Sequence, residues 1–108
     1  MAEREEKMQQ MQALEHSLQA LMAQKQSMQM QLAELESAVA ELAGKESAYR
    51  IVGNIMVSAK APELLKELEE KKELVEMRIS SVTKQENSVK KKAEQLQKDV
   101  LESMRQGS

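Results

Sequence analysis

The stretch AYRIVGNIMVSA, residues 48–59, decides the fold of this chain. Gly53-Asn54 at its centre is predicted to form a two-residue type II′ turn, because glycine readily takes the positive φ that the first central position needs. Counting outward from the turn predicts the cross-strand pairs Val52–Ile55, Ile51–Met56, Arg50–Val57 and Tyr49–Ser58. The sequence therefore predicts one β-hairpin at about residues 48–58, with largely apolar side chains on both faces.

Such a hairpin is not expected to stand alone. An isolated two-stranded hairpin is at best marginally stable in water, and apolar faces with two open edges favour aggregation. We therefore expect hairpins of several chains to join in a shared sheet or barrel. The expected oligomerisation residues are Tyr49, Ile51, Val52, Gly53, Asn54, Ile55, Met56 and Val57. The alternative is a hairpin packed back onto its own helices.

The segment before the hairpin carries a heptad repeat of apolar residues. With Met11 at an a position, the a series is Met11, Leu18, Lys25, Leu32 and Val39, and the d series is Leu14, Leu21, Met28, Leu35 and Leu42. All of these except Lys25 are apolar, which is typical of a coiled coil. We expect a helix over about residues 3–44, with Gly44 as its C-terminal stop.

A second heptad repeat follows the hairpin. Ala61-Pro62-Glu63 suits the start of a helix. The a series is Leu65, Lys72, Ile79, Glu86, Ala93 and Val100, and the d series is Leu68, Val75, Val82, Val89, Leu96 and Ser103. We expect a helix over about residues 62–105, antiparallel to the first because the connection is short. The predicted fold is mainly α: one domain over residues 1–108, a long antiparallel two-helix coiled coil with one central hairpin that joins an inter-subunit β-barrel platform.

Near the middle of the seam, the polar residues Lys25 and Glu86 interrupt the two repeats at similar distances from the hairpin turn. One interpretation is that they pair and fix the register of the helices at some loss of stability. The other is that each side chain extends separately to water.

Composition excludes several classes of protein. Of the 108 residues, 31% are charged, none is Phe, Trp or Cys, one is Tyr, and the net charge is −2. That charge argues against a purely electrostatic nucleic-acid binder, and the lack of cysteine fits a reducing cytosol. The first residues, MAEREEKMQQMQ, contain no apolar run for a signal peptide or a membrane span.

The hairpin YRIVGNIMV, followed by a helix that opens PELLKELEEKKELVEMRI, closely resembles the β-type subunit of prefoldin, an archaeal-like one. The resemblance covers essentially the whole chain. Heptads recur in unrelated proteins, so the hairpin with its Val-Gly-Asn turn and the Glu/Lys-rich helix start are the specific part. The α-type subunits of that family carry two hairpins between the helices, and this chain has room for one.

The resemblance implies a chaperone for protein folding that acts in the cytoplasm as a hetero-hexamer of two α-type and four β-type subunits. The hairpins of these subunits build a double β-barrel platform from which six coiled coils extend. Their tips bind unfolded client proteins without ATP and pass them to a group II chaperonin. A departure from the family is the unusual number of methionines, which is nine.

The residues at the helix ends far from the hairpin also suit client binding. Arg4 and Lys7 occupy a and d positions and so weaken the apolar seam, while other apolar residues stand at positions beside it. Fraying of the helix ends would also expose the seam residues nearby. Methionine is flexible and polarisable, which suits a surface that accepts many partners. The candidate client-binding residues are Met1, Met8, Met11, Leu14, Met22, Leu96, Val100, Leu101 and Met104.

Other functions find less support. We expect no catalytic activity, no metal and no cofactor, because the sequence shows no Ser/His/Asp, metal-spaced carboxylate or phosphate-loop pattern. His16 falls at a solvent-facing f position, and Lys90–Lys92 is a solvated charge run by default. The alternatives kept open are a structural or tethering coiled coil that oligomerises through its hairpin and, third, an arm that binds nucleic acid through Lys90–Lys92. We expect neither nucleic acid nor a membrane as a partner.

Overall fold

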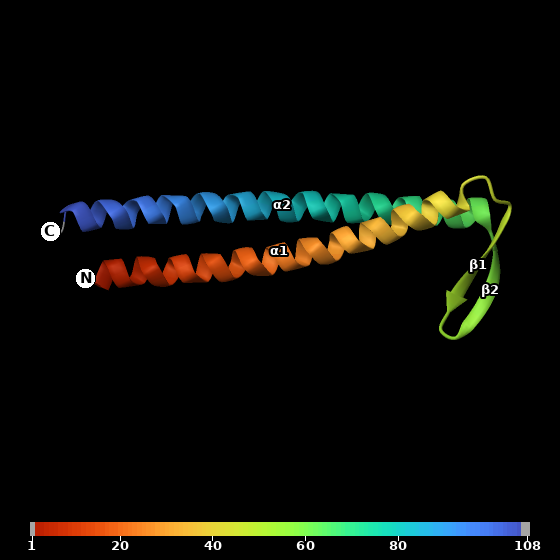
Figure 1. Ribbon diagram of the computed structural model, residues 1–108, viewed down its shortest axis with the longest axis horizontal. Helices are drawn as coiled ribbons and strands as arrows, with labels where there is room; N and C mark the ends of the chain where they lie inside the picture. Colours follow the sequence, from red (N-terminus) through yellow and green to blue (C-terminus); the bar gives the residue numbers. More distant parts are fainter. Residues whose placement is uncertain (1, 107–108) are drawn as a thin grey trace. The chain divides into compact units, whose positions relative to one another are not determined.

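The computed structural model describes residues 2–106. It contains the helix α1 (Ala2–Leu42), the strands β1 (Ser47–Val52) and β2 (Ile55–Lys60) and the helix α2 (Ala61–Gln106), in that order (Figure 1). The predicted mainly α fold, with two long helices and one antiparallel hairpin, is confirmed. The expected single domain over residues 1–108 stays a prediction.

The chain divides into two compact units. The terminal unit comprises Met1–Gln26 with Ser80–Ser108, and the hairpin unit comprises Ser27–Ile79. Each unit therefore contains one segment of α1 and one of α2, and only the hairpin unit contains strands. Within each unit the two helical segments run in opposite directions, because the chain reverses at the hairpin (Figure 1).

Helix α1 ends in a glycine stop. Gly44 has a φ of +77°, a conformation that glycine takes without the steric penalty that other residues meet. The amide of Ala43 donates to the carbonyl of Val39 at 3.1 Å, and that of Lys45 donates to the carbonyl of Leu42 at 3.1 Å. These bonds occupy carbonyls that the helix end would otherwise leave open. The helix ends at Leu42, two residues before the expected limit, because the glycine lies outside it.

The hairpin has the predicted register. Val52 pairs with Ile55, and the pairing continues outward to Ser47 with Lys60, so both strands are longer than expected. Gly53 has a φ of +63°, whereas no residue other than glycine has a positive φ within residues 2–106. A positive φ at the first central position alone is the pattern of a type II′ turn, as predicted.

Helix α2 begins directly after β2, without a linker. The amide of Ala61 donates to the carbonyl of Glu46 at 3.1 Å, and Ala61 is only 1% exposed. Pro62 occupies the first turn, where its missing amide hydrogen leaves no bond unmade. The base of the hairpin is thus tied to the first residue of α2 by a backbone hydrogen bond.

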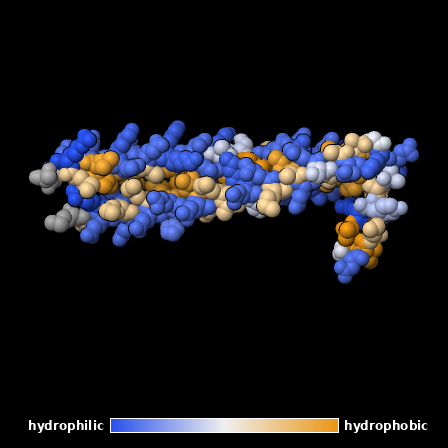
Figure 2. All heavy atoms as spheres, in the orientation of Figure 1, coloured by the Kyte–Doolittle hydropathy of each residue, from blue (hydrophilic) through white to orange (hydrophobic). Residues whose placement is uncertain are grey.

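The predicted heptads are confirmed by burial. Every a and d side chain from Arg4 to Leu42 and from Leu65 to Ser103 is buried or half-buried. Figure 2 shows apolar side chains of the terminal unit gathered in a band between two hydrophilic margins. The most deeply covered residues are Val82 and Glu86 in the terminal unit and Ala61 and Val75 in the hairpin unit.

Candidate functional site

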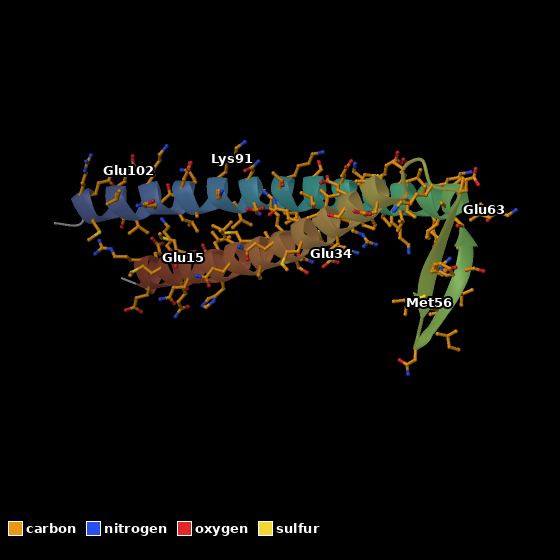
Figure 3. All side chains as sticks on the ribbon, turned by 45° about the vertical axis from the view of Figure 1, so that its right-hand side comes forward. Glu15, Glu34, Met56, Glu63, Lys91 and Glu102 are labelled. Carbon is orange, nitrogen blue, oxygen red and sulfur yellow. The ribbon has the colours of Figure 1, made fainter. Side chains whose placement is uncertain are left out.

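The hairpin presents an apolar surface that the rest of its unit does not cover. All the large apolar side chains of the two strands are exposed, up to 74% for Ile51. They are Tyr49, Ile51, Val52, Ile55, Met56 and Val57. Met56 is labelled on β2 in Figure 3. Exposed apolar residues on a short two-stranded sheet are the feature that an association surface requires.

The two faces of the hairpin have different chemistry. Alternation places Val52, Ile55, Arg50 and Val57 on one face, and Tyr49, Ile51, Met56 and Ser58 on the other, as the register dictates. The first face carries a cation beside three branched apolar side chains. The second carries the single aromatic ring and a thioether. The two faces are therefore suited to different neighbours.

A fork of hydrogen bonds ties the hairpin to α2. Arg50 Nη1 donates to Glu67 Oε2 at 3.3 Å, and Nη2 donates to Oε1 at 3.4 Å. Lys71 Nζ lies 3.6 Å from the same carboxylate. The hydrogen bonds and the charge of Arg50, with a smaller contribution from Lys71, hold the pKa of Glu67 below its ordinary value.

This fork was not expected from the sequence. Glu67 and Lys71 have the i,i+4 spacing that is typical of ion pairs on a helix, but Arg50 lies 17 residues away from Glu67. The sequence indicated the Arg50–Glu67 contact only indirectly. Because α2 follows β2 without a linker, a long cation on β1 can reach the first turns of that helix.

In the terminal unit, Lys25 and Glu86 pair as one of the two sequence interpretations proposed. Lys25 Nζ lies 3.3 Å from Glu86 Oε1, and the side chains are 26% and 8% exposed. The same oxygen has no partner with hydrogen-bond geometry. The contact is therefore an ion pair between facing opposite charges, but it lacks the directional hydrogen bond of a strong pair.

The candidate client-binding residues fall into two sets. Met8, Met22, Leu101 and Met104 are exposed, between 51% and 54%. Met11, Leu14, Leu96 and Val100 are half-buried in the seam. Met1 lies outside the described residues. The structure thus places four of the nine side chains in contact with solvent and four between the helices.

The exposure of seam residues by fraying of the helix ends stays a prediction. Helix α1 begins at Ala2 and α2 continues to Gln106. Arg4 Nη2 donates to the backbone carbonyl of Ser103 at 3.2 Å, which joins the two helices near their ends. Arg4 and Lys7 are themselves half-buried. The end of the seam is therefore polar, and a hydrogen bond joins the two helices there.

Sequence reasoning missed two grooves beside the seam of the terminal unit. The first, of about 480 Å³, is lined by Gln10, Ala13, Leu14, Ser17, Lys92, Gln95 and Leu96. The second, of about 440 Å³, is lined by Ser17, Ala20, Leu21, Gln24, Gln85, Ser88 and Val89. Both occur where small residues at c and g positions stand next to apolar seam residues. Small residues at these positions could therefore have indicated the grooves from the sequence.

Three further exposed apolar residues lie in the hairpin unit and were also missed. Met30 is 68% exposed, Met77 69% and Leu74 47%. Their f, f and c positions on the heptad point away from the seam, so the repeat itself indicated their exposure.

Within residues 2–106, no three His, Cys, Asp or Glu side chains are grouped so that they could hold a metal ion. Neither described helix contains a stretch apolar enough to cross a membrane.

Comparison with known proteins identifies the family. A family model described as prefoldin subunit matches residues 5–107. The prefoldin subunit beta of Sulfurisphaera tokodaii is 43% identical over 54 residues, which are 50% of this chain and 43% of that protein. The prefoldin subunit beta of Archaeoglobus fulgidus is 43% identical over 44 residues, 41% of this chain and 38% of that protein.

A solved structure matches over nearly the whole chain. The crystal structure of the prefoldin beta subunit from Thermococcus strain KS-1 has a TM-score of 0.91 and 25% sequence identity, and the match covers 97% of this chain and 95% of that one. In the curated relatives, by contrast, the matched segments span less than half of the protein's length. The family model, these relatives and the single hairpin between two heptad-bearing helices agree with one another: the chain belongs to the prefoldin subunit family, as one of its β-type members.

Proposed function

We propose that the chain is a holdase subunit of a prefoldin hetero-hexamer, which binds non-native proteins without ATP and delivers them to a group II chaperonin in the cytoplasm. Its partners are α-type prefoldin subunits, two with four β-type chains, and unfolded clients. The observation that supports this most is the exposure of large apolar side chains both on the hairpin and in the terminal unit. Two such surfaces suit two different tasks, assembly and capture.

In this proposal the hairpin is the assembly surface. Its open strand edges offer backbone hydrogen bonds to strands of other subunits, and its exposed side chains form the interior of a shared barrel. The residues that take this role are Tyr49, Ile51, Val52, Gly53, Asn54, Ile55, Met56 and Val57. The Arg50–Glu67 fork holds the hairpin against its own helix, so that less conformational freedom is lost on assembly.

The exposed residues of the terminal unit are the capture surface. Met8, Met22, Leu101 and Met104 stand outside the seam and are available to a client. Each contact is weak, but several subunits of one assembly can hold the same chain, and their contacts add through high effective concentration. Weak, flexible contacts also allow release to a chaperonin and acceptance of many clients.

The decisive experiment measures assembly and protection together. The chain alone, and the chain mixed with an α-type prefoldin subunit, are examined by native mass spectrometry and by light scattering of an aggregating denatured protein. The proposal expects a mixed hexamer that keeps the client in solution without ATP. A small oligomer that neither binds the α-type chain nor prevents aggregation of the client contradicts the proposal and favours a tethering coiled coil.

A further inference from the structure

The outer surface of the terminal unit has an uneven distribution of charge. Between residues 80 and 98, α2 carries five exposed lysines: Lys84, Lys90, Lys91, Lys92 and Lys98. The same stretch has two carboxylates, and that of Glu86 is already paired with Lys25 in the seam. Within residues 2–106 none of the five ammonium groups takes part in an ion pair. The result is an excess of positive charge on one helix.

The opposite helix does not balance this charge. Between residues 8 and 24, α1 contains a single carboxylate, Glu15, and otherwise mainly Gln, Ala, Met and Leu. Figure 3 shows Lys91 on the side of α2 that faces away from α1. The lysines therefore face solvent, where a charged partner can reach them.

One of these cations, Lys92, lines the larger groove. Its lining includes the half-buried Leu14 and Leu96 together with the exposed Lys92, and the small side chains of Ala13 and Ser17. An apolar side chain placed in this groove would contact the two leucines. A carboxylate on a neighbouring residue of the same segment would then lie beside Lys92.

We propose that this lysine-bordered groove selects, among non-native polypeptides, segments that combine apolar and acidic residues. The inference rests on the proposed holdase function and names the class of client that the terminal unit prefers. Charge complementarity fixes the occupant, because a basic segment would be repelled by the five lysines and a purely polar one would leave the groove unfilled.

The spacing of the cations suits an extended chain. Lys84, Lys91 and Lys98 recur every seven residues and so are separated by roughly 10.5 Å along the helix. An extended polypeptide advances about 3.3 Å per residue. A carboxylate at every third residue of a client can therefore meet successive lysines. Each exposed pair contributes little by itself, so the preference needs several pairs and is weakened by salt.

The test uses three fluorescent peptides of equal length on the full chain. One combines Leu with Glu, one combines Leu with Lys, and one combines Gly and Ser with Glu. We expect the Leu/Glu peptide to bind about tenfold more tightly than either of the others at low salt, and expect high salt to remove most of that difference. Fluorescence anisotropy measures the three dissociation constants.

Two pairs of variants assign the binding to this surface. The triple variant Lys84→Gln, Lys91→Gln and Lys92→Gln should weaken the Leu/Glu peptide about five- to tenfold. The matched control removes the same charge from the hairpin unit, through Lys45→Gln, Lys66→Gln and Lys71→Gln, and should change its binding less than twofold. Ala13→Leu fills the groove and should weaken the same peptide, whereas Ala23→Leu, at an exposed f position, should not.

Other results would overturn the inference. Equal binding of the Leu/Glu and Leu/Lys peptides, or equal effects of the two triple variants, removes the charge preference. If a single-stranded DNA oligomer and the Gly/Ser/Glu peptide bind as tightly as the Leu/Glu peptide, the lysines form a general polyanion surface and the groove has no role. Protection of basic and acidic denatured clients alike leaves the holdase function intact and rejects only the selection, whereas protection of neither client rejects the holdase function itself.

Discussion

Nζ of Lys25 lies 3.3 Å from Oε1 of Glu86, so that a cation of α1 and an anion of α2 meet at a positions between apolar seam residues of the terminal unit. Glu86 is 6% exposed and is thus among the best-covered residues of the described chain. Burial of a carboxylate is unfavourable unless an opposite charge compensates it. The pair therefore favours the register in which Lys25 and Glu86 meet. A shifted register would separate the two charges and leave the buried carboxylate uncompensated.

We predict that Lys25→Met lowers the free energy of unfolding by about 2 kcal/mol, since it leaves the Glu86 carboxylate buried and uncompensated. The effect is smaller than for a fully buried pair because Lys25 is 26% exposed. The double variant Lys25→Leu and Glu86→Leu should be at least as stable as the natural chain. Urea unfolding followed by circular dichroism measures both. Equal loss of stability in the single and double variants would contradict this account.

We predict that Ile51→Asp or Val57→Asp abolishes assembly and leaves helical monomers, because a charge would have to enter the shared apolar interior. Ser47→Asp is the control, since it adds the same charge to an exposed position of the same hairpin that lies outside the assembly residues. Native mass spectrometry distinguishes the species. An unchanged oligomer mass in the Ile51 and Val57 variants would argue against the hairpin as the assembly surface.

We predict that Gly53→Ala destabilises the hairpin by about 1–2 kcal/mol, because alanine is strained at a φ of +63°. Space is not the reason, since a Cβ at this position would meet no heavy atom within 4 Å. Asn54→Ala, where φ is not positive, is the matched control and should have little effect. Amide hydrogen exchange of the strand residues measures local opening, and equal protection in the two variants would disprove the conformational argument.

We predict that Arg50→Gln raises the pKa of Glu67 toward its ordinary value of 4.5 and increases the mobility of the hairpin. The folded state lowers this pKa, so the contact stabilises the fold above the pKa of the unfolded chain. That stabilisation is lost as the pH falls through the lowered pKa. An NMR titration of the Glu67 side chain measures the change. Lys71→Gln should raise the pKa less, and a larger effect there would reverse the assignment.

We predict that Met8→Ser with Met104→Ser reduces the protection of an aggregating client while the oligomer persists. The control is Met30→Ser with Met77→Ser, which removes two methionines of even greater exposure from the hairpin unit. Light scattering of a denatured client compares the two variants. Loss of protection in both would mean that methionine content matters and that its position does not.

The sequence predicted those features that depend on a short local repeat. The heptads indicated every seam position, because a period of seven fixes which side chains face the other helix. The hairpin register followed from Gly53, since a two-residue turn leaves one way to pair the strands. Even the Lys25–Glu86 pair could be proposed, because counting from the turn gives the relative level of residues on two antiparallel helices.

Other features depend on how elements meet in space and were not predictable in this way. The Arg50–Glu67 fork requires the direction in which the hairpin leaves α2, which no repeat encodes. The grooves follow from the separation of the helices beside small residues such as Ala13 and Ser17. The sequence likewise showed cations at the end of the seam but not the hydrogen bond from Arg4 to the carbonyl of Ser103.

The uncovered hairpin also has a consequence for a chain that finds no partners. Six large apolar side chains stand exposed on two adjacent short strands, and the cell's proteases and other chaperones recognise such surfaces as a sign of incomplete folding. A subunit made in excess would therefore be degraded because its hairpin stays exposed. Association with other subunits would cover the hairpin and protect the chain, so the amount of this chain in the cell would depend on the amount of its partners.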